Sequence, residues 1–149
     1  MSKDYQDLTN ANKIVISSST KNLAKVRNFV ENKAVELGFD SNEINQIILS
    51  VDEACTNIIK YTHNFNESEN IEVITESKNK EFRIIMKYRG RDFDPNKMEE
   101  PNMKEYFNNF KVGGLGIPMM KKFMNKVEYH HVNPDMNSLT LIKSLQNSR

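Results

Sequence analysis

Apolar residues recur along the chain with two different periods, and the change between them predicts the order of the elements. Residues 14–16, Ile-Val-Ile, form a short strand candidate that ends in the serines at 17–19. A helix is predicted from about Thr20 to Leu37, because its apolar residues follow helical spacing and Gly38 supplies a left-handed stop. The chain therefore begins with a strand that leads into a helix.

A second helix is predicted to begin almost at once. Asp40 can cap it, and Glu43, three residues later, completes the arrangement of a capping box. Its buried stripe is expected to consist of Ile44, Ile47, Ile48, Val51, Ala54, Cys55 and Ile58.

Two strands come next, from Ile71 to Glu76 and from Phe82 to Tyr88. The polar turn at 77–80 predicts that they form an antiparallel hairpin. Alternation along the second strand puts Tyr88 on the same face as Met86, with Phe82 and Ile84.

A long irregular stretch then runs from Gly90 to Val112, and its length is typical of a lid or binding loop, here placed at about 95–113. A helix from about Ile117 to Asn125 and a hairpin of residues 127–132 and 138–145 complete the chain. This order predicts an α+β (two-layer α/β) sandwich: a mostly antiparallel mixed sheet with helices on one face.

Size and composition fit one domain over residues 1–149, with residues 1–12 as a loose polar lead-in. Hydrophobic residues make up 38% and charged residues 28%, which is typical of a globular protein. The formal charge of +1 favours protein or small-molecule partners over direct nucleic-acid or membrane binding. Cys55 is the single cysteine, no apolar run approaches about 20 residues, and the polar start does not look like a secretory signal. We therefore expect a cytoplasmic protein.

The first candidate site is Glu53-Ala54-Cys55-Thr56-Asn57 on the second helix. Glu53 and Asn57 are four residues apart, so they project from the same side, away from the apolar stripe. A solvated polar face is one interpretation. Leu49, one turn earlier on that side, favours a cleft wall or a protein contact instead. A carboxylate can orient or deprotonate a hydroxyl, and an amide oxygen can bind Mg²⁺.

Two glycine segments complete the candidates. The segment from Tyr88 to Pro95 follows a strand, where Gly90 permits a close backbone approach and Phe93 could pack beneath a ligand; an ordinary strand-to-loop turn is the alternative. Gly113, Gly114, Leu115 and Gly116 open a helix whose backbone N–H groups could receive phosphate, although a flexible hinge is equally consistent.

Taken in order, these three segments resemble the N, G1 and G2 boxes of the Bergerat ATPases. The N box with Gly113-Gly114-Leu115-Gly116-Ile117 and the tail Asn137-Ser138-Leu139-Thr140-Leu141 are similar to one branch, the anti-sigma factor serine/threonine kinases. The likeness spans roughly residues 14 to 145.

The resemblance implies the Bergerat ATP-binding fold and a transferase that regulates transcription. Glu53 would be the catalytic base and Asn57 the Mg²⁺ ligand between the ATP phosphates. Gly90 would lie near adenine, and the glycines at 113–116 would cradle phosphate. The implied partners are a sigma factor and an anti-sigma-factor antagonist, which the kinase phosphorylates on Ser or Thr. Homodimers are common in that family, which leaves a homodimer open here.

The chain departs from the family at Tyr88, where the pattern has an aspartate that accepts the adenine amino group. Losing a charged hydrogen bond costs about 1.5–3 kcal/mol, and a bulky ring could fill part of the adenine site. The alternative function is therefore a non-catalytic binding module of the same fold, with weak or lost nucleotide binding; an unrelated structural domain is a third. His63, His130 and His131 are expected at surface or strand positions.

Overall fold

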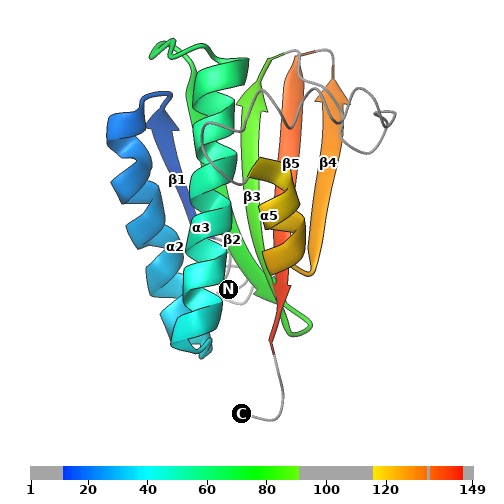
Figure 1. Cartoon of the computed structure of the whole chain (residues 1–149). Helices are drawn as coiled ribbons and strands as arrows, with labels where there is room; N and C mark the ends of the chain where they lie inside the picture. The colour runs from blue at the N-terminus through cyan, green and yellow to red at the C-terminus, as the bar shows by residue number, and fades with distance from the viewer. Residues whose placement is uncertain (1–11, 91–115, 134, 146–149) are drawn as a thin grey trace, which may run out of the picture.

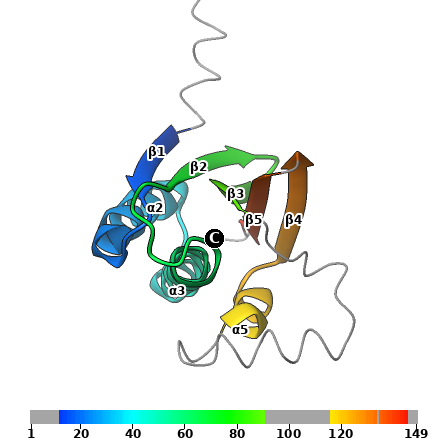
Figure 2. The ribbon, with the colours of Figure 1, turned by 90° about the horizontal axis from the view of Figure 1, so that it is seen from above.

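In the part of the chain that the structure describes, five strands form one sheet, and three α-helices pack against one of its faces (Figure 1, Figure 2). The computed structural model describes residues 12–90, 116–133 and 135–145. In chain order the elements are β1 (Asn12–Ser17), the 3₁₀ turn η1 (Thr20–Asn22), α2 (Leu23–Leu37), α3 (Ser41–Asn57), the π turn η2 (Ile58–Thr62), β2 (Asn70–Lys78), β3 (Glu81–Arg89), α5 (Gly116–Phe123), β4 (Lys126–Asn133) and β5 (Met136–Ser144).

The strand order is β1-β2-β3-β5-β4, and all four pairings are antiparallel. This arrangement confirms the predicted two-layer fold class. Seen from above, the helices lie together on the concave side of the curved sheet (Figure 2). Within the described ranges, no helix is both long and apolar enough to cross a bilayer.

Short-range sequence signals determine where the first two helices meet. α2 ends at Gly38, whose φ of 94° is in the left-handed region that glycine adopts without strain. The capping box of α3 is complete: the Glu43 N–H donates to Asp40 Oδ1 at 2.8 Å, and the Asp40 N–H donates to Glu43 Oε1 at 3.0 Å. Both predicted boundaries are therefore confirmed.

The β2–β3 hairpin is confirmed as well, with a two-residue turn. Asn79 and Lys80 have φ values of 53° and 63°, the signature of a turn whose twist matches that of paired strands. The resulting register pairs Ile71 with Tyr88. It fixes which side chains of β3 face the helices.

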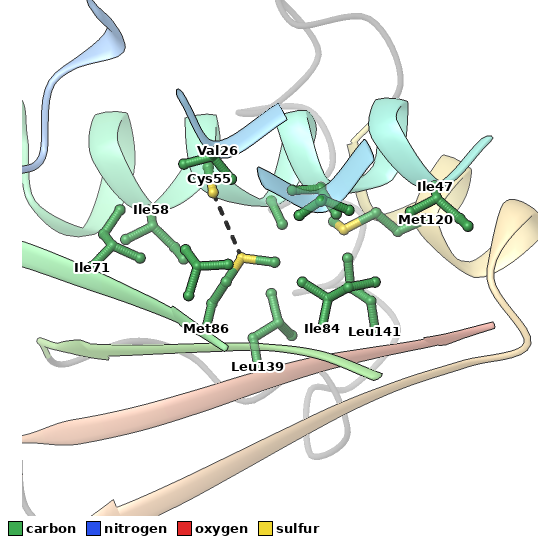
Figure 3. Close-up of a cluster of buried hydrophobic side chains, with 14 of the residues drawn as sticks. Val26, Ile47, Cys55, Ile58, Ile71, Ile84, Met86, Met120, Leu139 and Leu141 are labelled. Atoms are coloured by element: carbon green, nitrogen blue, oxygen red, sulfur yellow. Dashed lines mark hydrogen bonds between the residues drawn. The ribbon is translucent and has the colours of Figure 1, made fainter. Parts of the chain in front are cut away.

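The core lies between α3 and the inner face of the sheet (Figure 3). From α3 it takes Ile47, Val51 and Cys55, all fully buried, and from β3 it takes Ile84 and Met86. Burying such a side chain contributes about 1.5–3 kcal/mol each. The Cys55 Sγ lies 3.7 Å from the Met86 Sδ, and burial, followed by the charge of Asp52, raises the pKa of the Cys55 thiol to about 12. Cys55 is thus a packing residue and stays a thiol at neutral pH.

The π turn at the end of α3 is a feature that the apolar pattern did not predict. The helix does not stop at Ile58: it widens into η2, where the His63 N–H donates to the Ile58 carbonyl at 2.8 Å. π turns of this kind are frequent at functional sites. Here the turn brings His63 inward, to 6% exposure, so the expected surface position of His63 was wrong.

Candidate functional site

Glu53 and Asn57 lie on the second half of α3 and are both buried. Their exposed fractions are 9% and 7%, whereas Leu49, one turn earlier, is 48% exposed. The line of residues along this side of the helix therefore passes from solvent into a covered region. The interpretation as a solvated polar face is wrong, and the alternative that took Leu49 as a sign of a cleft wall or a protein contact fits the burial better.

The amide of Asn57 is the clearest sign of an incomplete polar site. Its Nδ2 is buried and has no hydrogen-bond partner among the described residues. An unsatisfied buried polar group costs about 1–3 kcal/mol, so such groups call for an explanation. Because a half-turn exchanges the two ends of a carboxamide, Asn57 can offer a ligand either an N–H or an oxygen.

Gly90 follows β3 and brings the backbone very close to the end of the helix. Its φ is 141°, and a Cβ built on it would come within 2.5 Å of Thr62 Cγ2. Only glycine fits this approach without displacement. The Gly90 N–H donates to the Asp135 carbonyl at 2.9 Å, and the Gly90 carbonyl accepts from Asn137 Nδ2 at 2.6 Å. The turn after β3 is thus fixed against both the helix and β5.

Tyr88 occupies the position where the family resemblance expects an aspartate, and it is buried. Only 3% of the residue is exposed, and it shares the inner face of β3 with Met86, as predicted. Its ring meets the His63 ring edge-on, with centroids 6.1 Å apart and an interplanar angle of 77°. The tyrosine therefore fills its position instead of standing in an open cleft.

The orientation of α5 follows from the contacts of its last residue. The Lys143 Nζ donates to the Phe123 carbonyl at 2.5 Å and to Gln46 Oε1 at 2.8 Å, and burial lowers the pKa of Lys143. Lys143 pairs with Phe82, at the end of the sheet opposite Gly90. The N-terminus of α5 therefore points toward the Gly90 end.

The length of α5 then gives the height of Gly116 beside α3 (Figure 1). Phe123 lies seven positions after Gly116, a rise of about 10 Å along a helix. Glu53 likewise lies seven positions after Gln46 on α3, the antiparallel neighbour. Gly116 consequently lies within about one turn of the level of Glu53.

The structure therefore places parts of all three predicted segments toward the same end of the fold. Glu53 and Asn57 lie on α3, Gly90 contacts the extension of that helix, and the start of α5 is directed toward the same end. The remaining predicted site residues, Phe93, Gly113, Gly114 and Leu115, lie outside the described residues, as does the lid predicted at about 95–113.

Sequence reasoning missed two residues beside this site, His63 and Asn137. Nothing in the local pattern marks His63 as buried. Asn137 did carry a signal, because alternation from Leu139 places it on the inner face of β5. Its buried amide donates to Gly90, and its Oδ1 accepts from the Tyr129 hydroxyl at 2.5 Å and from His131 Nδ1 at 2.7 Å. His130 and His131 do lie on a strand, β4, as predicted.

A separate hollow of about 350 Å³ lies near the same end of the sheet. Its lining includes Tyr88 and Arg89 but neither Glu53 nor Asn57. Carboxylates and cations both contribute to its walls, through Glu72 and Lys87 among others. This balance of charge gives the hollow no preference for an anion.

Comparison with known proteins identifies the family of this chain. The profile of the histidine kinase-like ATPase domain matches residues 16–143, most of the chain. The chain belongs to the histidine kinase-like ATPase domain family. The family match therefore covers α3, the Gly90 turn, α5 and the whole sheet apart from most of β1 and the end of β5.

Two serine-protein kinases are similar to this chain at low identity. Serine-protein kinase RsbW of Halalkalibacterium halodurans is 26% identical over 119 residues, covering 77% of this chain and 72% of that protein. Serine-protein kinase RsbW of Oceanobacillus iheyensis is 26% identical over 102 residues, covering 66% of this chain and 65% of that protein. These similarities place the chain near RsbW-like anti-sigma factor kinases.

A solved structure supports the same fold. The crystal structure of the RsbU and RsbW domains of Rv1364c from Mycobacterium tuberculosis matches 91% of this chain with a TM-score of 0.64 and 16% identity. This ATPase domain spans only 32% of that longer chain. At such low identity the match shows the shared fold and nothing about activity.

Proposed function

We propose that this chain is an anti-sigma regulator that binds a sigma factor and phosphorylates an anti-sigma-factor antagonist on Ser or Thr, with Mg·ATP as the phosphoryl donor. The family match and the RsbW relatives support this function. The observation that carries it is the pair Glu53 and Asn57, buried one helical turn apart near the Gly90 turn, with one end of the Asn57 amide lacking a partner among the described residues.

Glu53 and the end of the Asn57 amide that lacks a partner in the described part of the chain suit the phosphates and metal of a nucleotide, whereas the buried Tyr88 does not match the expected adenine contact. When bound, Mg·ATP would supply the transferable γ-phosphoryl group. Asn57 would turn its amide oxygen toward the metal, a ligand type that Mg²⁺ accepts. Glu53 would take the proton of the antagonist's hydroxyl as that oxygen bonds to the γ-phosphorus and the bond to the leaving oxygen of ADP breaks.

The remaining site residues are assigned by the family resemblance. Gly90 would lie beside the adenine ring of the nucleotide, with Tyr88 and Phe93 near that ring. The segment from Gly113 to Gly116 would bind phosphate at the N-terminus of α5, where helix N–H groups favour anions. The direction in which α5 runs supports this assignment, and residues 95–113 would form the lid.

Thermal unfolding with and without Mg·ATP tests binding. A ligand present at one hundred times its dissociation constant stabilises the native state by about 2.7 kcal/mol. Transfer of labelled phosphate to a purified antagonist then tests the kinase step. Glu53→Gln preserves the shape of the side chain, so stabilisation by Mg·ATP should persist while transfer falls by about 10²–10⁴-fold.

Glu36→Gln is the matched control, since the Glu36 side chain on α2 is 69% exposed. This variant should transfer phosphate at the wild-type rate. If Glu53→Gln transferred phosphate at the wild-type rate, Glu53 would not be the catalytic base.

The burial of Tyr88 favours a second candidate, the binding module with weak or lost nucleotide use. A tyrosine that is 3% exposed occupies space at the position expected to contact adenine. If millimolar Mg·ATP leaves the unfolding temperature unchanged while the protein still co-elutes with a purified sigma factor, this second function holds.

Both candidates imply a cytoplasmic protein, because sigma factors and their antagonists act there. The oligomeric state is a separate question. Sedimentation of the purified chain over a range of concentrations would show whether it forms the homodimer that is common among such kinases.

A further inference from the structure

His63 joins three segments that are distant in the sequence. Both ring nitrogens have partners: Nδ1 lies 2.8 Å from Ser18 Oγ, and Nε2 lies 2.8 Å from the Arg89 carbonyl oxygen. A carbonyl can only accept, so Nε2 carries the proton and donates to Arg89. In the neutral ring, Nδ1 then accepts from the Ser18 hydroxyl. We name this chain of two hydrogen bonds the His63 link.

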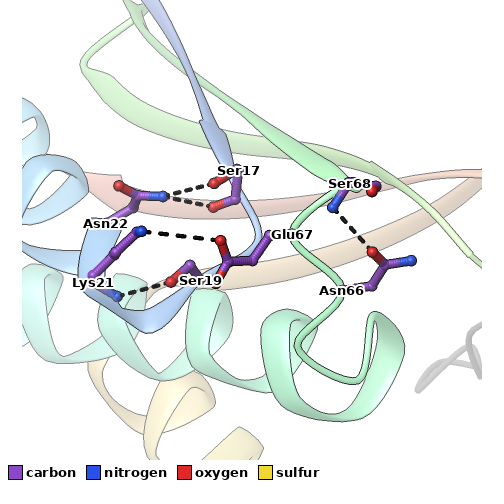
Figure 4. Close-up of polar contacts among 7 residues, drawn as sticks. All are labelled: Ser17, Ser19, Lys21, Asn22, Asn66, Glu67 and Ser68. Carbon is purple, nitrogen blue, oxygen red and sulfur yellow. Dashed lines mark hydrogen bonds and ion pairs between the residues drawn. The ribbon is translucent and has the colours of Figure 1, made fainter.

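The Ser18 end of the link is anchored. Ser18 is fully buried, and its N–H donates to the Glu69 carbonyl at 2.9 Å. Around it, Asn22 Nδ2 donates to the carbonyl and the hydroxyl of Ser17 (Figure 4). The Lys21–Glu67 ion pair, at 4.0 Å, connects η1 to the segment that precedes β2 (Figure 4). The link therefore starts from a point that several independent contacts hold in place.

The other end of the link acts on the residue next to Gly90. His63 holds the Arg89 carbonyl from the helix side, and Asp135 and Asn137 hold Gly90 from the β5 side. The His63 ring also packs edge-on against Tyr88. Arg89, the last residue of β3, and Gly90, which follows it, are thereby held from two directions, and the φ of Gly90, 141°, is one that a residue other than glycine rarely adopts.

We infer that His63 is a positioning residue for the nucleotide site: through the His63 link it presets the Gly90 turn and the Tyr88 ring against the end of α3. The inference rests on the proposed function, because it assigns the Gly90 turn to the base of a nucleotide. A preset turn lowers the cost of binding, since the turn need not be ordered when the ligand arrives.

Three substitutions separate the two hydrogen bonds of the link. His63→Phe keeps a ring against Tyr88 but removes both nitrogens. His63→Asn reaches only as far as Nδ1 and can still accept from Ser18. His63→Gln reaches as far as Nε2, so its amide N–H can still donate to the Arg89 carbonyl. The hydrogen bond to Arg89 is the one that acts on the turn. The Gln variant should therefore keep the wild-type affinity for Mg·ATP, and the Asn variant should not.

Calorimetric titration with Mg·ATP measures how each substitution changes nucleotide affinity. The dissociation constant should rise about tenfold in the Phe and Asn variants, the usual worth of one hydrogen bond, and should stay within about twofold in the Gln variant. The kcat at saturating ATP should stay within about twofold in all three. His130→Phe, at an exposed histidine of β4, is the control and should bind as the wild type does.

Amide hydrogen exchange without nucleotide measures positioning directly. The Gly90 N–H should exchange about tenfold faster in His63→Phe, while core amides of β3 keep their wild-type rates. Unchanged affinity and unchanged Gly90 exchange, with a lowered unfolding temperature alone, would reduce His63 to a structural residue and leave the kinase proposal intact. A wild-type protein that binds no Mg·ATP would instead refute both proposals.

Discussion

Replacing Gly90 by alanine tests the close approach between the end of β3 and the end of the α3 helix. The added Cβ would lie 2.5 Å from Thr62 Cγ2, far inside van der Waals contact, at a φ of 141°. Backbone strain of this kind costs about 1–3 kcal/mol, and forcing an extra methyl into a packed site costs about 1–3 kcal/mol more. Gly90→Ala should therefore lower the free energy of unfolding by about 2–6 kcal/mol.

Gly38→Ala is the matched control. Gly38 also has a positive φ, 94°, but a Cβ there would meet nothing within 4 Å. Gly38→Ala should lower the free energy of unfolding only through backbone strain, by about 1–2 kcal/mol. The difference between the two alanine variants then measures the contact with Thr62.

A double-mutant cycle isolates that contact further. Thr62→Ser removes Cγ2 and keeps the hydroxyl, so in the Gly90→Ala background it should restore at least about 1 kcal/mol relative to its effect in the wild type. Urea unfolding, compared at equal m-values, provides all four free energies. Equal costs for both glycine variants, or no coupling to Thr62, would refute the predicted clash.

Three further predictions concern the fold around the site. Asp40→Ala removes one half of the capping box and should cost about 1 kcal/mol in urea unfolding; no loss would mean that the cap of α3 is dispensable. The pKa of the Cys55 thiol is raised to about 12 from 9.0, so the folded state binds more protons than the unfolded state between these values. The stability advantage of the wild type over Cys55→Ala should accordingly shrink above pH 9, by about 1.4 kcal/mol at pH 10, and a constant gap would contradict this. Asn137→Asp sets a carboxylate against the Gly90 carbonyl, so it should cost about 2–4 kcal/mol at pH 7 and less, relative to wild type, at pH 4.5, where a protonated carboxyl can donate; a pH-independent cost would refute this account.

Local sequence rules accounted for the elements and for part of the site. The capping box at Asp40, the stop at Gly38 and the alternation through Met86 and Tyr88 act between residues at most four positions apart. Such short-range rules depend little on distant parts of the chain, which is why the predicted order of elements and the fold class were confirmed. They also put Glu53 and Asn57 on one side of a helix.

Only the tertiary structure decided how those residues are surrounded. Helical spacing alone left Glu53 and Asn57 open to interpretation as a solvated face, and nothing in the sequence placed His63 in the interior. The deciding contacts join residues far apart in the chain: His63 meets Ser18 at a separation of 45 residues and the Arg89 carbonyl at 26, and Asn137 meets Gly90 at 47. Burial and polar partners depend on which distant segments pack together, and that packing is settled by the whole core, not by any local pattern.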